Sequence, residues 1–282
     1  MAVEGIMQGM TNGISPSRAR RRTIAIAIEK GGVGKTTITA TLGVVIANHF
    51  NLRVLLLDFD PQRNLTIACL GAGHQPGRTV VDVCMGRASL ADVLVPAVDL
   101  HPNVLVAPGS QDLANIERRV DWEQSAIGIV SALRKSIPPD IDLVLIDTPP
   151  GKNLWLRTAL SGADYYLVVG EPEMLCALGT LDVHATARSV PNPHLTFLGL
   201  VVNKVDVRLN EHSATIAWYR NKYPKAIIEP FVPMRAAIKE SVRTRRYLEL
   251  LNTDSYLGEV FYQVAETVLR RMGVGQPVPV LA

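Results

Sequence analysis

The sequence predicts an α/β fold in which a doubly wound, mostly parallel sheet carries helices on both faces. Two observations predict this fold. Short apolar runs of strand length alternate with longer helix-compatible stretches along nearly the whole chain. A glycine-rich segment, Lys30 to Thr37, stands between the first apolar run and the first helix-compatible stretch. That order of strand, loop and helix is typical of a phosphate-binding loop.

The predicted strands are short, and runs such as Val54–Leu57 and Leu143–Ile146 are apolar throughout, as is typical of strands buried on both faces of a parallel sheet. In chain order they are Thr23–Ile28, Val54–Leu57, Val104–Ala107, Leu143–Ile146, Tyr165–Val169, Phe197–Val202 and Ala226–Phe231. The helix-compatible stretches are Thr36–Phe50, Trp122–Lys135, Leu175–Ser189, Glu211–Lys222 and Tyr256–Met272. The alternation favours one domain over two.

Composition supports a single domain over residues 23–272. The 282 residues are 48% hydrophobic, which is enough to bury a substantial core. Residues 1–22 contain four arginines against one glutamate, and residues 273–282 are uncharged with two prolines. Both ends are interpreted as flexible extensions, the first of them basic. The N-terminal extension alone accounts for the net charge of +3, so the remaining residues sum to zero.

Several classes of protein are disfavoured. The three cysteines are widely spaced, without a C-x-x-C pair that would hold zinc or an iron–sulfur cluster. The longest uncharged stretch, Thr36 to Leu52, is shorter than a membrane span. The N-terminus lacks an apolar segment after a basic start, so no signal peptide is predicted. We therefore expect a cytoplasmic protein.

The chemistry of the glycine-rich loop is that of a phosphate site. Its glycines let successive backbone N–H groups point into one concavity, and the helix that follows adds its positive N-terminal end. Lys35 supplies a point charge for the β- and γ-phosphates, and the Thr36 hydroxyl is placed to ligate Mg²⁺. The predicted nucleotide contacts here are Gly31, Gly32, Val33, Gly34, Lys35, Thr36 and Thr37.

Aspartates follow two of the predicted strands. Asp58 and Asp60 come after Val54–Leu57, and Asp147 comes after Leu143–Ile146. Ligands in open α/β sheets bind at the carboxyl ends of the strands, so these side chains are expected near the phosphate loop. An aspartate at such a strand end suits a contact to Mg²⁺ or to its water shell.

The loop departs from the ordinary phosphate-loop pattern, because Glu29 stands where that pattern has its first glycine. The segment K-G-G-V-G-K-T-T resembles the deviant Walker A motif of the ParA/MinD family of ATPases. The family's D-x-D-P-Q-x-N and D-x-P-P motifs also match, at Asp58 to Asn64 and at Asp147 to Pro150. Two positions differ from the family's usual residues: Arg63 replaces a common glycine, and Met234 a common arginine.

This resemblance implies roles for individual residues. Lys30 would reach the nucleotide phosphates of a partner subunit and, with Lys35 and Asp60, form the catalytic set. Asp60 would position the attacking water, and Thr36, Asp60 and Asp147 would hold Mg²⁺, the aspartates through water. Asn203 would contact adenine, and Pro233 would cover the other side of the base.

A basic segment near the C-terminus resembles the family's DNA-contacting region. Its cations are Arg235, Lys239, Arg243, Arg245 and Arg246, against one acid, Glu240, within twelve residues. This composition favours a sequence-independent contact with the phosphate backbone of double-stranded DNA. The alternative is a solvated helix face whose charges serve solubility.

The resemblance implies a ParA-like ATPase that uses ATP and Mg²⁺, forms a homodimer on ATP binding and binds DNA non-specifically. It would drive plasmid or chromosome partition, associate with the nucleoid when ATP-bound, and be stimulated by a centromere-binding, ParB-like protein. One alternative is a MinD-like ATPase that positions a membrane- or protein-bound cargo. Membrane binding is disfavoured because Tyr256–Met272 lacks a basic polar face along its length. Another alternative is a ligase of the same fold, against which Lys30 argues.

Overall fold

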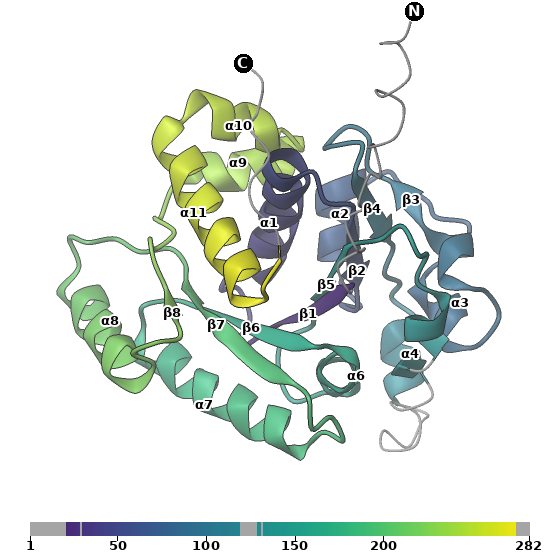
Figure 1. Cartoon of the computed structure of the whole chain (residues 1–282), viewed down its shortest axis with the longest axis horizontal. Coiled ribbons are helices and arrows are strands. Elements are labelled where there is room, and N and C mark those ends of the chain that lie inside the picture. The colour runs from purple at the N-terminus through teal and green to yellow at the C-terminus, as the bar shows by residue number, and fades with distance from the viewer. Residues whose placement is uncertain (1–20, 29, 119–128, 131, 275–282) are drawn as a thin grey trace, which may run out of the picture.

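The computed structural model describes residues 21–28, 30–118, 129–130 and 132–274. Its centre is an eight-stranded sheet with the order β3-β4-β2-β5-β1-β6-β7-β8 (Figure 1). The strands are β1 (Arg22–Ala27), β2 (Val54–Asp58), β3 (Val95–Pro96), β4 (Val104–Ala107), β5 (Leu143–Asp147), β6 (Tyr165–Gly170), β7 (Thr196–Val202) and β8 (Ile227–Ile228). All neighbouring pairs are parallel except β3 with β4, which confirms the predicted doubly wound sheet.

The two edges of the sheet differ from the prediction. Strand β3 was not predicted, because two residues carry no measurable alternation. Strand β8 is much shorter than the predicted run Ala226–Phe231. Pro230 lacks an amide N–H and cannot continue the ladder. Beyond it, the Val232 amide donates to the Val202 carbonyl at 2.9 Å, so the chain still lies along β7.

The long helices cover both faces of the sheet (Figure 1). Helix α1 (Lys35–Phe50) packs on β1, β2, β4 and β5, with α11 (Ser255–Arg271) beside it. On the opposite face, α6 (Leu154–Gly162) contacts β1, and α7 (Met174–Ser189) contacts β6. Helix α8 (Asn210–Lys222) packs on α7. The predicted helix Trp122–Lys135 falls mostly outside the described residues.

Several short helices were not predicted. They are α2 (Asn64–Leu70), α3 (Val80–Cys84), the 3₁₀ turn η1 (Leu90–Val93), α4 (Leu113–Glu117), α9 (Ala236–Thr244) and α10 (Tyr247–Thr253), together with α6. Each spans at most nine residues, too few turns for a helical period to show in sequence. Local chemistry fixes their ends: the Asn153 side chain, for example, accepts from the Leu156 amide at 2.8 Å and caps α6.

The carboxyl ends of β1, β2, β5, β6 and β7 meet at one edge of the sheet, as parallel pairing requires. Asp58 and Asp147 are register partners on β2 and β5, so two of the predicted site aspartates lie side by side. Most of both predicted terminal extensions, residues 1–20 and 275–282, lies outside the described residues; Arg22 already belongs to β1. Among the helices of the described ranges, none is long and apolar enough to cross a bilayer.

Candidate nucleotide site at the carboxyl edge of the sheet

The loop between β1 and α1 has the backbone of a phosphate cradle. Gly32 and Gly34 take left-handed conformations, with φ of +80° and +89°. A Cβ on Gly34 would lie 2.4 Å from Asn203 Nδ2, so a side chain is excluded there by contact as well as by conformation. Helix α1 begins at Lys35 and has no acidic residue in its first turn. Its positive end is therefore free for an anion.

Lys35 lies at the base of this cradle and is only 7% exposed. Burial lowers the pKa of its ammonium group, while the charges of Asp147 and Asp60 act in the opposite direction. A buried ammonium group attracts an anion placed against it strongly, and here it also offsets the repulsion that the two carboxylates exert on phosphate. This arrangement agrees with the predicted role of Lys35 as the cation beneath the β- and γ-phosphates.

Asp147 ends β5 beside the first turn of α1. Its Oδ2 accepts from the Thr36 hydroxyl at 2.6 Å, so two of the predicted magnesium residues are in direct contact. Burial, followed by the neighbouring charge of Asp58, raises the pKa of Asp147 to about 7. Excess negative charge at a buried site of hydroxyl and carboxylate oxygens is what a hard divalent cation relieves, so these residues fit Mg²⁺.

The two aspartates after β2 have separate surroundings. Asp58 is fully buried and accepts from the hydroxyl and amide of Thr66, at 2.7 and 2.8 Å, so it is directed at α2. Burial raises the pKa of Asp58 to about 6. Asp60 lines the same cavity as the phosphate loop, and its Oδ1 accepts from the Gln62 amide at 2.9 Å. Of the two, Asp60 is therefore the one available to a ligand.

Two cavities flank the phosphate loop, and both include Gly32, Gly34 and Thr37. The phosphate-side cavity, of about 580 Å³, also contains Asp60 and Lys35. The base-side cavity, of about 440 Å³, contains Asn203 and Pro233, the two residues for which the family resemblance implies contacts with adenine. Both volumes fall in the usual range for small-ligand pockets. The Asn203 Nδ2 donates to the Val33 carbonyl at 2.8 Å, which leaves its Oδ1 for a base.

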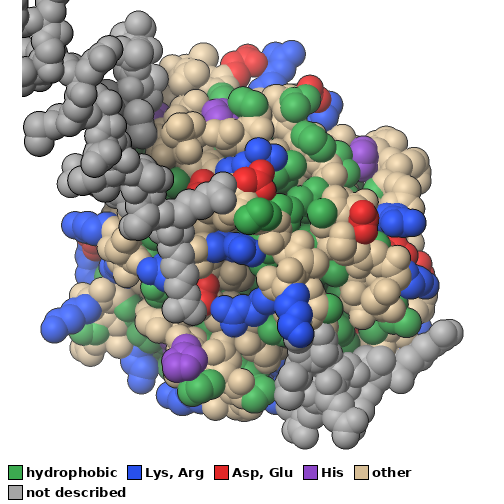
Figure 2. Space-filling model, turned by 45° about the vertical axis from the view of Figure 1, so that its right-hand side comes forward, with side chains coloured by type: hydrophobic (Ala, Val, Ile, Leu, Met, Phe, Trp, Pro, Cys, Tyr) green, Lys and Arg blue, Asp and Glu red, His purple; other side chains and the backbone are tan. Residues whose placement is uncertain are grey.

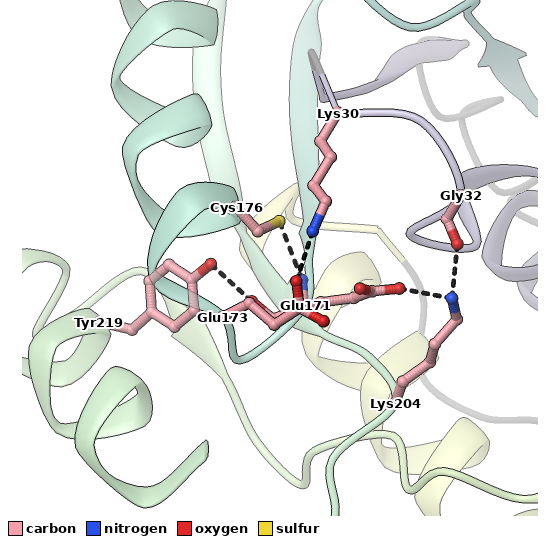
Figure 3. A network of polar contacts seen from close by, with 7 residues as sticks. All are labelled: Lys30, Gly32, Glu171, Glu173, Cys176, Lys204 and Tyr219. Atoms are coloured by element: carbon pink, nitrogen blue, oxygen red, sulfur yellow. Dashed lines mark hydrogen bonds and ion pairs between the residues drawn. The ribbon is translucent and has the colours of Figure 1, made fainter. Parts of the chain in front are cut away.

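Lys30 is directed away from the loop that follows it. Its ammonium group donates to Glu173, just before α7, at 2.5 Å (Figure 3). That hydrogen bond is the main cause of a raised pKa for Lys30 and of a lowered one for Glu173. About a third of the Lys30 side chain is exposed, so solvent can reach this pair. Within the described residues, Lys30 thus contacts a carboxylate of its own subunit.

The five predicted DNA-binding cations do not share one setting. Arg235 and Lys239 line the base-side cavity, whereas Arg243 and Arg245 line the phosphate-side cavity. Arg246 lies outside both. Three of them have acidic partners: Arg243 pairs with Glu240, Arg245 with Asp99, and Arg246 with Glu249. On the face shown in Figure 2, basic side chains are interspersed with acidic and hydrophobic ones.

Sequence reasoning missed three charged residues of the site: Glu171, Glu173 and Lys204. All three line the base-side cavity. Glu171 and Glu173 follow the end of β6, much as Asp58 and Asp147 stand at the ends of β2 and β5. The same rule of polar residues at strand ends, applied to Tyr165–Val169, would have identified the two glutamates. The same rule, applied to Phe197–Val202, would also have indicated Lys204, although its contacts with Gly32 and Glu171 could not be read from sequence.

Comparisons with known proteins agree with this geometry. A model of the AAA domain matches residues 21–196. The chromosome partitioning protein ParA of Caulobacter vibrioides is 30% identical over 260 residues, which cover 89% of this chain and 94% of that protein. The chromosome-partitioning ATPase Soj of Thermus thermophilus is 29% identical over 259 residues, or 90% of this chain and 98% of the relative.

Solved structures share the fold. Apo McdA from Cyanothece superposes with a TM-score of 0.76 at 21% identity, over 88% of this chain and 99% of that one. Cobyrinic acid a,c-diamide synthase from Mycobacterium smegmatis, with bound ATP analogue and magnesium, gives a TM-score of 0.69 at 25% identity. The superposition covers 93% of this chain and 100% of the synthase chain.

A doubly wound sheet whose first strand leads through a glycine cradle into a helix, with aspartates at the neighbouring strand ends, defines a P-loop ATPase. The chain belongs to the ParA/MinD family of these enzymes, and its relatives at about 30% identity make it a ParA-type member. Nucleotide and magnesium are the ligands used in this family.

Proposed function

We propose that this ParA-type ATPase dimerises on binding ATP and Mg²⁺, binds double-stranded DNA without sequence preference, and drives plasmid or chromosome partition. A centromere-binding, ParB-like protein would stimulate hydrolysis and so release the dimer from DNA. The protein would be cytoplasmic and associated with the nucleoid while ATP-bound. The observation that carries the proposal is the second lysine: Lys30 lies outside the cradle of its own subunit, in a partly exposed pair with Glu173, and would exchange that carboxylate for a partner's phosphates.

The residues divide the chemistry as follows. The loop amides and Lys35 would bind the β- and γ-phosphates, while Asn203 and Pro233 would enclose adenine. Thr36, Asp60 and Asp147 would hold Mg²⁺, the two aspartates through water, and the metal when bound neutralises charge that develops on the phosphates. Asp60 would orient the attacking water from the phosphate-side cavity. Transition-state stabilisation by fixed charges is the main source of rate in such a site.

Lys30→Ala is expected to abolish ATP-driven dimerisation, because it removes the one cation proposed to reach across the interface to the partner's phosphates. Light scattering with saturating ATP and Mg²⁺ measures this directly. The matched control is Lys225→Ala, which removes an exposed lysine far from the loop in sequence. A Lys30→Ala protein that dimerises as the control does would contradict the role given to Lys30.

DNA binding is tested by fluorescence anisotropy with unrelated duplexes, in ATP, in ADP and without nucleotide, across a salt series. We expect salt-sensitive binding in ATP alone, indifferent to sequence. Arg246→Ala should weaken it and lower the slope of log affinity against log salt by about 1.8, since a dimer loses two phosphate contacts of about 0.9 each.

Arg220→Ala is the matched control, because Arg220 is similarly exposed and also pairs with one glutamate, Glu229. An unchanged slope in Arg246→Ala would remove Arg246 from the DNA contact. Absence of DNA binding by the wild type in all three nucleotide states would overturn the partition proposal and leave the MinD-like positioning of a cargo.

A further inference from the structure

Two successive carbonyl groups of the phosphate loop are captured by side chains from the end of β7. Lys204 Nζ donates to the Gly32 carbonyl at 2.5 Å, and Asn203 Nδ2 donates to the Val33 carbonyl at 2.8 Å. Both donors come from one turn, although they lie about 170 residues beyond the loop in sequence. The loop is therefore fixed from outside as well as by its own glycines.

The direction of these carbonyls matters for anion binding. A peptide carbonyl carries partial negative charge and repels phosphate, whereas the N–H of the same unit attracts it. A phosphate loop works only when its carbonyls point outward and its amides inward. Donors that hold the Gly32 and Val33 oxygens on the β7 side therefore leave the amide groups for the phosphate side.

Lys204 is itself fixed by a carboxylate. Its ammonium group also pairs with Glu171, which follows β6 and whose side chain is 11% exposed (Figure 3). The Glu171 backbone is held at both of its polar groups. Its amide donates to Cys176 Sγ at 3.1 Å, and its carbonyl accepts from the Tyr219 hydroxyl at 3.0 Å. Cys176 and Tyr219 are fully buried, so this chain of contacts runs from the core to the loop.

The backbone at both ends of this chain is adapted to it. Lys204 adopts a backbone φ of +57°, a left-handed conformation that residues other than glycine rarely take. A Cβ on Gly170 would lie 2.9 Å from the Tyr219 hydroxyl oxygen, so the glycine permits the close approach of that ring. Such a conformation at a non-glycine residue persists where the surrounding contacts hold it, and the Lys204 ammonium group makes two of these contacts.

We propose that Lys204 and Glu171 form a brace that orients the phosphate loop for nucleotide, with Lys204 as a positioning residue and Glu171 as its anchor. The inference rests on the proposed ATP hydrolysis and adds two residues to that site. The brace acts before nucleotide arrives, because it joins the side chains of Lys204 and Glu171 to the loop backbone. Loss of the brace should therefore lower nucleotide affinity and kcat/KM, and should change kcat less.

The test compares Lys204→Met, which keeps the unbranched stem and removes the donor, with Lys204→Arg, which keeps a cationic donor. Lys225→Met is the matched control for the same change at an exposed site. Binding of a fluorescent ATP analogue should weaken about tenfold in Lys204→Met, as expected for a lost hydrogen bond to a charged group, and Lys204→Arg should recover most of it. Thermal unfolding of each variant checks that the fold is intact.

A second measurement needs no turnover. Hydrogen–deuterium exchange of the nucleotide-free protein should be faster over residues 30–34 in Lys204→Met than in the wild type, because a loop whose carbonyls are released becomes more mobile and exposes its amide groups more often. In a double-mutant cycle, Glu171→Gln should add little to Lys204→Met, since the anchor acts through the lysine.

Two results would overturn the brace while leaving the ATPase intact: unchanged affinity and exchange in Lys204→Met, or additive effects in the cycle. A wild-type protein that fails to bind the ATP analogue would instead overturn the proposed ATP hydrolysis, and the brace with it. Equal loss of affinity in Lys204→Arg and Lys204→Met would also count against a positioning role that depends on the donor.

Discussion

Lys35→Ala should reduce ATP hydrolysis by about 10²–10³-fold, the usual cost of removing one fixed donor from a transition-state site. The effect should be at the upper end of that range, because the lysine is buried beside Asp147 and Asp60. Its removal takes away a phosphate contact and also leaves those carboxylates to repel the incoming nucleotide. ATP binding should therefore fail together with turnover.

Steady-state phosphate release and binding of a fluorescent ATP analogue measure the two effects for Lys35→Ala. Lys225→Ala provides the reference for loss of a lysine outside the site. Hydrolysis within tenfold of the wild-type rate would show that Lys35 does not contact the transferring phosphoryl group.

Asp60→Ala should separate binding from turnover. The carboxylate lies in the phosphate-side cavity at the end of β2, where it can orient water. Loss of such a group typically costs about 10²–10⁴-fold in rate. Because Asp60 is not among the residues assigned to the phosphates or the base, ATP should still bind, and the dimer should accumulate instead of being released by hydrolysis.

Light scattering of Asp60→Ala with saturating ATP and Mg²⁺ should show a long-lived dimer, and ADP should not produce it. Asp140→Ala is the matched control, since Asp140 precedes β5 at the opposite edge of the sheet. A monomeric Asp60→Ala protein in ATP, or one that hydrolyses ATP at the control's rate, would show that the role given to Asp60 is wrong.

Much of the fold could be predicted from sequence because its strands are buried on both faces. Apolar runs such as Val54–Leu57 need no partner to be recognised, and the phosphate loop fixes the direction of the chain around them. The α2 to α4 region could not be predicted in the same way. Its helices are short, and they form where side chains such as Asp58 and Thr66 meet, which depends on tertiary contacts.

The candidate site likewise contains residues that local sequence indicates and residues that only tertiary contacts bring together. The residues Lys35, Thr36 and Asp147 could be predicted because motif and strand end bring them together locally or through parallel pairing. The pair of Lys30 with Glu173 spans 143 residues, and only the fold brings the two together. For the basic segment, sequence proximity is misleading. Its cations are adjacent in sequence but have different neighbours in the fold, such as Asp99 for Arg245 and Glu249 for Arg246.

The capture of the Gly32 and Val33 carbonyls from β7 has a consequence for protein engineering. A transplanted segment of residues 30–37 would carry its glycines and lysines into a new scaffold, but not the donors that set the direction of its peptide planes. The proposed brace therefore implies that nucleotide binding is not a modular property of an eight-residue motif. The smallest transferable unit joins the loop to the ends of β6 and β7, which lie more than a hundred residues away along the chain.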